Sequence, residues 1–207
     1  MSIAREGLPY ILVPALVAAL LFAFGYWAIA IVLILLMLGM AFFFRDPQRK
    51  PPADPNVVVS PADGRVTRVR KITPEEYDSP TLVSIFLSPL DVHINRAPIA
   101  GVIKDVSYVP GKFLMATNER ASAVNEQNAL TIEGENVTVV CKQIAGILAR
   151  RVVCWKRKGD RLSLGERFGL IKFSSRTDLI LPQQVDVLTH EGARVRGGTT
   201  IIGRIRQ

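Results

Sequence analysis

The stretch RFGLIKFSSRTDLILP, residues 167–182, indicates the fold of the C-terminal part of the chain. Two apolar segments, 168–173 and 179–181, have the composition of buried β-strands. The five polar residues between them, 174–178, predict a tight corner, because Ser and Asp side chains bond to nearby backbone in turns. A corner between two buried strands is typical of an all-β domain.

The chain before and after this stretch continues the same arrangement from residue 57 onward. Short apolar or alternating runs are separated by Gly and Pro, and only residues 112–127 are expected to be helical or irregular. Many short strands at close spacing predict a mainly β domain, a sandwich or barrel, rather than a parallel α/β sheet. Further strands are expected at 57–60, 65–72, 82–87, 100–109, 129–132, 137–144 and 147–155, and two short ones within 192–203.

The N-terminal segment, residues 8–44, contains no charged residue. Apolar runs at 8–24 and 28–44 are separated by Gly-Tyr-Trp at 25–27. One continuous helix would be about 55 Å long, well beyond a hydrocarbon core of about 30 Å. Two short transmembrane helices joined at Gly25 fit better, although one long tilted span and a cleaved signal peptide before a single anchor remain alternatives.

Cations flank both apolar runs and are missing between them. Arg5 precedes the first run, and Arg45 follows the second. The positive-inside tendency predicts that both ends of this hairpin, and the domain after it, lie on the cytoplasmic side of the cell membrane. We therefore expect a membrane hairpin at 1–45, an extended linker at 46–56 with four prolines, and a β-rich domain at 57–207.

The chain is basic, with a formal net charge of +8 over 207 residues. It has no zinc-finger spacing and no run of five basic residues, so an anionic membrane surface explains the charge better than nucleic acid does. Cys141 and Cys154 lie in apolar runs and are expected to be buried, reduced thiols. Two Cys and two His at these spacings predict no metal site.

Several short motifs occur together in a fixed order. They are FFFRDP at 42–47, SPADG at 60–64, DVHINRAP at 91–98, RFGLIKFSSR at 167–176 and VRGGT at 195–199. Each taken alone has an ordinary structural explanation as a turn or strand. Together they resemble the short-form phosphatidylserine decarboxylase proenzymes, and the resemblance covers essentially the whole chain. The turn and closing segments also resemble biotinyl and lipoyl carrier domains, which implies a fold like a barrel-sandwich hybrid.

The resemblance implies that the enzyme converts phosphatidylserine to phosphatidylethanolamine through a Schiff base with a covalent pyruvoyl group. Ser175 would become the pyruvoyl group by autocatalytic serinolysis at the Ser174–Ser175 bond, leaving chains 1–174 and 175–207. His93 would be the base that activates Ser175, and Asp63 would orient His93. Ser174 stands where the family usually has Gly, which leaves open a rival assignment with Ser174 as the nucleophile.

The chemistry requires these residue types. Loss of carbon dioxide from an α-amino acid leaves an electron pair, which a carbonyl condensed with the substrate amine can accept. A Ser hydroxyl is a poor nucleophile without a neighbouring base that is itself oriented. Arg96, Arg150 and Arg151 are candidate contacts for the lipid headgroup, whereas His190 is expected to be exposed and uninvolved.

Other functions remain open at this level. They are a non-enzymatic membrane adaptor with a carrier-like β-domain, an archaetidylserine decarboxylase, and a relative that never cleaves itself. A homo-oligomer is compatible with all of them.

Overall fold

The computed structural model divides the chain into two compact units, Met1–Gln48 and Arg49–Gln207, which are described separately. Two residues of interest, Arg150 and Ser174, lie outside the described residues. The structure describes residues 2–73, 76, 78–115, 118, 120–147, 151–173 and 175–206.

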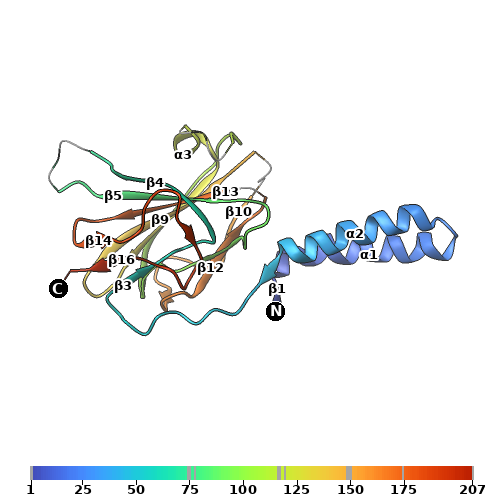
Figure 1. Ribbon diagram of the computed structural model, residues 1–207, viewed down its shortest axis with the longest axis horizontal. Coiled ribbons are helices and arrows are strands. Elements are labelled where there is room, and N and C mark those ends of the chain that lie inside the picture. Colours follow the sequence, from blue (N-terminus) through green and yellow to red (C-terminus); the bar gives the residue numbers. More distant parts are fainter. Residues whose placement is uncertain are drawn as a thin grey trace. The chain divides into compact units, whose positions relative to one another are not determined.

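The first unit is a pair of apolar helices, α1 (Leu8–Ala23) and α2 (Trp27–Phe43), drawn in blue in Figure 1. The turn between them contains Gly25, whose φ of 83° is a left-handed conformation that Gly adopts without a Cβ clash. Together with the helical turn that precedes it, α1 forms a 19-residue helical segment, Arg5–Ala23, which is long and apolar enough to cross a membrane. The predicted pair of short apolar helices is therefore present.

The open end of the helix pair is closed by a short antiparallel ladder. Strand β1 (Ser2–Ile3) pairs with β2 (Arg45–Asp46), and a 3-10 turn, η1 (Arg5–Gly7), leads from β1 into α1. The ladder joins the two ends of the hairpin, which the apolar pattern alone did not predict.

The second unit is almost entirely β, as predicted. It contains a curled eight-stranded antiparallel sheet and two three-stranded sheets (Figure 1). The strand order in the large sheet is β11-β7-β8-β9-β13-β5-β4-β15, and the smaller sheets are β10-β12-β6 and β14-β16-β3. The elements are β3 (Val57–Val59), β4 (Gly64–Lys71), β5 (Thr81–Leu87), β6 (Ile94–Arg96), β7 (Gly101–Val109), α3 (Ala121–Val124), β8 (Gln127–Glu133), β9 (Thr138–Ala145), β10 (Val152–Cys154), β11 (Arg161–Leu162), β12 (Arg167–Ile171), β13 (Ser175–Leu181), β14 (Val185–Val187), β15 (Arg194–Val195) and β16 (Ile201–Ile205).

The hydrophobic core lies on one face of the large sheet, which we call the inner face. Directly paired residues of antiparallel strands point to the same face, so Leu179, Cys141 and Leu130 form one buried row across β13, β9 and β8. Residues of the smaller sheets, including Phe168 and Ile202, belong to the same buried cluster. The smaller sheets therefore cover the inner face.

The prediction of a polar corner at 174–178 was wrong. Residues 175–178 are the first four residues of β13, and each of them is almost completely buried. Strand β13 is paired on one side with β5 and on the other with β9. The polar run was misinterpreted because Arg176, Thr177 and Asp178 find buried partners, which turn propensity cannot register.

One smaller expectation changed, and another was confirmed. Among the described residues of the strand expected at 147–155, β10 covers Val152–Cys154, whereas 148–150 lie outside the described residues. The described residues of 112–127 are mainly irregular and include the four-residue helix α3, as expected. Both cysteines are free, Cys141 buried and Cys154 half-buried, and His190 is exposed as expected.

Candidate active site

Ser175 is the first residue of β13 and is fully buried. It pairs with Leu87 at the end of β5 and with Ala145 at the end of β9. Its Oγ has no hydrogen-bond partner among the residues that the structure describes. A buried hydroxyl without such a partner costs free energy, and a reactive role is one explanation for keeping it.

His93 lies at the end of the loop that leaves β5 beside Ser175. Asp91 holds this loop, since its Oδ2 accepts hydrogen bonds from the Ser88 backbone N–H at 2.9 Å and from the Ser88 hydroxyl at 2.7 Å. The Nδ1 of His93 lies 2.9 Å from the carbonyl oxygen of Asp91. Because a carbonyl can only accept, Nδ1 must donate, which leaves the lone pair on Nε2 in the neutral imidazole.

The register places His93 on the same side as Ser175. Asn95 donates from Nδ2 to Oγ1 of Thr177 at 3.0 Å, so β6 lies over the inner face of β13. His93 directly precedes β6, and its carbonyl oxygen accepts a hydrogen bond from the Ile171 backbone N–H at 3.3 Å, so it extends the ladder with β12. It precedes Asn95 by two residues, as Ser175 precedes Thr177. Asp91 anchors His93 beside Ser88, the residue after the one paired with Ser175. The loop and the strands therefore bring His93 and Ser175 to the same end of the core.

A fully buried amide network lies directly beneath this end. Gln143 donates from Nε2 to Oδ1 of Asn95 at 2.9 Å, and Asn128 donates to Oε1 of Gln143 at 3.3 Å. With the bond from Asn95 to Thr177, the network links β8, β9, β6 and β13. Satisfied buried networks of this kind fix one arrangement of the layers, and here they fix the strand that carries Ser175.

Asp63 lies at the start of β4, in the predicted turn, and is largely buried. Its Oδ2 binds Nη2 of Arg49 at 2.7 Å, and its Oδ1 accepts a hydrogen bond from the Gly197 backbone N–H at 2.8 Å. These two bonds join the linker, the turn at 60–64 and the closing segment. Neither bond involves His93, so the assignment of Asp63 as the residue that orients His93 stays a prediction.

The outer face of β13 carries a buried ion pair. Nε of Arg176 lies 3.0 Å from Oδ1 of Asp178, and both side chains are 2% exposed. Ser122 in α3 donates to Oδ2 of Asp178 at 2.9 Å. Burial lowers the pKa of the Arg176 guanidinium, and the neighbouring Asp178 acts in the opposite direction. The pair thus attaches the segment containing α3 to the strand that begins with Ser175.

Glu126 is a buried carboxylate that sequence reasoning missed. It immediately precedes β8 and is 5% exposed. The Ala145 backbone N–H donates to its carbonyl oxygen at 2.9 Å, so Glu126 continues the ladder opposite Ala145, the residue that pairs with Ser175. The only sequence signal was an acidic residue at the edge of an apolar strand, which is ordinary. Its position became visible only with the register of three strands.

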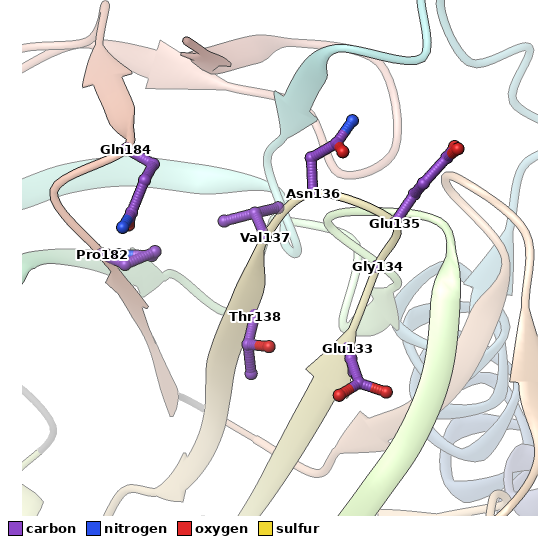
Figure 2. Close-up of a pocket in the computed structure, with 8 residues that line it drawn as sticks. All are labelled: Glu133, Gly134, Glu135, Asn136, Val137, Thr138, Pro182 and Gln184. Carbon is purple, nitrogen blue, oxygen red and sulfur yellow. The ribbon is translucent and has the colours of Figure 1, made fainter. Parts of the chain in front are cut away.

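The described surface also contains an open hollow away from Ser175, at the tip of the β8–β9 hairpin (Figure 2). Pro182, which follows the last residue of β13, lies on its wall, about 23 Å along the strand from Ser175 at about 3.3 Å per residue. The side chains of Glu133 and Glu135 point in different directions in Figure 2. The hollow therefore does not belong to the Ser175 site.

The described residues contain no group of three His, Cys, Asp or Glu side chains that could hold a metal ion. A buried serine and a histidine fixed in one tautomer at the same end of a core are instead the parts of a nucleophilic site. The fold and these side chains therefore have the features expected of an enzyme with a serine nucleophile.

Comparison with known proteins gives the family. The phosphatidylserine decarboxylase family model matches residues 36–203. The phosphatidylserine decarboxylase proenzyme of Symbiobacterium thermophilum is 50% identical over 99% of this chain and 96% of its own length. Those of Solibacter usitatus and Geotalea uraniireducens are 47% and 41% identical, over 99% and 97% of this chain and 97% and 95% of their own lengths. The chain belongs to the phosphatidylserine decarboxylase family, and it is therefore a carboxy-lyase.

Proposed function

We propose that this chain cleaves itself before Ser175 and then decarboxylates phosphatidylserine to phosphatidylethanolamine with a pyruvoyl group made from that residue. The observation that carries the proposal is the buried Ser175 Oγ, which has no hydrogen-bond partner among the described residues, at the end of the core that also holds His93. The matching relatives are named proenzymes of phosphatidylserine decarboxylase, which agrees with a chain that is processed.

The surroundings of Ser175 fit a pyruvoyl group. The group would be the first residue of β13, held by ladders to β5 and β9 and next to the small side chain of Ala145. When formed, it supplies a carbonyl that condenses with the substrate amine and accepts the electron pair left by carbon dioxide. The chain's own residues supply the fixed position, the exclusion of water and the proton transfers.

Self-cleavage uses the hydroxyl and the imidazole. Ser175 Oγ attacks the carbonyl carbon of residue 174 while Nε2 of His93 accepts its proton, and the amide becomes an ester with a free amine on residue 175. Loss of the Ser175 α-proton then expels residue 174 as a carboxylate and leaves dehydroalanine. Tautomerisation and attack by one water release ammonia and leave the carbonyl group.

The strand pairings explain how two chains would remain one enzyme. The small chain, residues 175–207, would contain β13 to β16. Strand β13 pairs with β5 and β9, β15 pairs with β4, and β16 pairs with β3, so three of its strands pair directly with the large chain. Separation would require breaking the central sheet, and we expect the chains to separate only on denaturation.

The membrane hairpin and the basic charge fit a substrate that stays in a bilayer. The apolar pair α1 and α2 would anchor the chain in the cell membrane, with the β-rich domain on the cytoplasmic side. Of the headgroup candidates, Arg151 is exposed and joins Lys172 through a backbone bond, next to the Ser175 end of the core. Arg96 is buried and donates to the carbonyl oxygen of Gly165 at 3.2 Å, so we infer a structural role for it.

The test is the intact mass of the purified protein. We expect two chains, and the smaller should be about 3.6 kDa, its share of the 22.8 kDa proenzyme. Ser175→Ala should stay uncut. Ser84→Ala is a matched control, because Ser84 is equally buried and its Oγ also has no hydrogen-bond partner among the described residues, and it should be cut normally.

The same mass measurement decides between the two serines. Ser174 contributes only its carbonyl, so Ser174→Gly should still be cut, and the absence of a Cβ can speed the reaction. Cleavage of Ser175→Ala together with an uncut Ser174→Gly would assign the pyruvoyl precursor to Ser174 instead. A single uncut wild-type chain that decarboxylates phosphatidylserine would refute the pyruvoyl mechanism.

A further inference from the structure

Glu126, Ala145 and Ser175 form one row across three strands. Ser175 pairs with Ala145, and Ala145 is hydrogen-bonded to the carbonyl of Glu126. Residues paired across antiparallel strands point to the same face, so all three side chains point to the inner face. Two strand spacings of about 4.8 Å place the Glu126 and Ser175 backbones about 10 Å apart.

The neighbouring row confirms which face this is. Thr177, Gln143 and Asn128 are paired in the same way, two residues further along each strand. Their side chains belong to the network that includes Asn95 of β6. Glu126 therefore lies under the same layer as His93, and the methyl group of Ala145 is the only side chain between it and Ser175 in their row.

Two groups donate hydrogen bonds to the carboxylate of Glu126. The Val152 backbone N–H donates to Oε1 at 3.1 Å. Desolvation, the negative charge of Glu126 and a hydrogen bond from the Tyr108 hydroxyl to the carboxylate, in that order, raise the pKa of Tyr108. These donors are neutral, so the negative charge of Glu126 is not cancelled by them. A buried carboxylate with only neutral donors favours a cation at the side that they leave open.

The proposed substrate brings such a cation to this place. The serine headgroup of the lipid has an ammonium group, and its nitrogen must reach the carbonyl carbon of residue 175. The Glu126 side chain extends several ångströms from its backbone at one end of the row. Its carboxylate can therefore bind an amine that lies over Ala145. Arg151 is exposed and directly precedes Val152, whose backbone N–H donates to Glu126, so it lies near enough to offset the anionic groups of the same headgroup.

We propose that Glu126 binds the ammonium group of the lipid headgroup and directs its nitrogen to residue 175. This inference rests on the proposed function, and it adds a substrate-binding residue to Ser175 and His93. The competing explanation is that Glu126 only fixes the Val152 backbone. Glu126→Gln separates the two, because the amide oxygen can still accept that hydrogen bond while the charge is lost.

The experiment uses full-length processed protein in lipid nanodiscs, as wild type, Glu126→Gln and Glu126→Asp. Short-chain phosphatidylethanolamine is the probe, since it has the amine but no carboxylate to lose. Cyanoborohydride traps the amine on residue 175, and the mass of the small chain reports the trapped fraction against probe concentration. Hydroxylamine, which is uncharged at neutral pH, is the control reagent for the same carbonyl. Processing is followed on a gel for every variant.

We expect Glu126→Gln to raise the half-saturating amine concentration about tenfold, the effect of losing one charge-assisted hydrogen bond. Its reaction with hydroxylamine should be unchanged. Glu126→Asp keeps the negative charge but shortens the side chain by one methylene, so it should weaken amine trapping less than Glu126→Gln does. If Glu126→Gln does not fold, Glu126→Asp provides the test.

Two results overturn the inference while leaving the proposed function intact. One is an equal loss of amine trapping and hydroxylamine reaction, which would assign Glu126 a purely structural role. The other is unchanged amine trapping in both variants. A wild-type protein that forms no hydroxylamine adduct would have no carbonyl at residue 175, and that result would remove the proposed function and this inference together.

Discussion

Phe173 is the described non-glycine residue with a positive φ, 54°, and it stands two residues before the proposed nucleophile. The left-handed region costs a residue with a Cβ about 1 kcal/mol, and such strain persists only where the surrounding structure imposes it. Cleavage after residue 174 would release Phe173 from the chain that continues into β13. Strain present before the reaction and relieved during it lowers the barrier, so Phe173 is predicted to accelerate self-cleavage.

The perturbation is Phe173→Gly, which removes the conformational cost without changing the fold around it. Loss of about 1 kcal/mol of ground-state strain should slow cleavage about fivefold. Phe173→Ala is the matched control, because it loses the ring but keeps the Cβ and therefore the strain.

The assay is a time course of precursor disappearance after synthesis in a cell-free system, read on a gel. The informative quantity is the ratio of the two variants' rates, since both lack the ring. Equal rates for Phe173→Gly and Phe173→Ala would refute the reasoning, whatever their rates relative to the wild type. A faster Gly variant would show that the left-handed conformation hinders the reaction.

Three further predictions concern the residues around the site. Asp178→Asn leaves the buried Arg176 without its counter-charge, so the unfolding free energy of the uncleaved Ser175→Ala chain should fall by about 3 kcal/mol, measured by urea unfolding; a change under 1 kcal/mol would contradict this. Asp63→Ala removes the acceptor for Arg49 and Gly197, so cleavage on a gel time course should become severely slow, and a normal rate would exclude a role for Asp63. Burial raises the pKa of both thiols, Cys141 the more deeply buried, so iodoacetamide should label folded protein slowly at pH 8 and faster as pH rises, Cys154 before Cys141; rapid labelling of Cys141 would be inconsistent with its burial.

The sequence was sufficient for features that depend on local pattern. The charge-free segment at 8–44 and its central Gly predicted two helices, because both helical length and apolar composition are local quantities. The alternating runs after residue 57 predicted a mainly β fold for the same reason. The run at 175–178 was misassigned because four polar residues in succession are unfavourable in a central strand unless most of them have buried partners. Those partners, such as Asn95 and Ser122, are more than 50 residues away in sequence, and no local pattern contains them.

Glu126 illustrates why part of a site can stay hidden in a sequence that otherwise reveals its function. His93 and Ser175 were found through short motifs that surround them. The position of Glu126 instead depends on the registers of two successive strand pairings. Strand β13 must pair with β9 so that Ser175 meets Ala145, and the ladder between β9 and β8 must place Glu126 opposite that same alanine.

A shift of one residue in either pairing would turn the carboxylate to the outer face, with Arg176 and Asp178. The buried network of Asn95, Gln143, Asn128 and Thr177 excludes such a shift, since its hydrogen bonds form in one register only. If Glu126 binds the substrate amine as proposed, the amides beneath the site hold it in that position, and weakening them should reduce amine trapping even with Glu126 in place. Gln143→Leu tests this step: it should raise the half-saturating amine concentration as Glu126→Gln does, and an unchanged value in a folded, processed protein would show that the ladder alone sets the register.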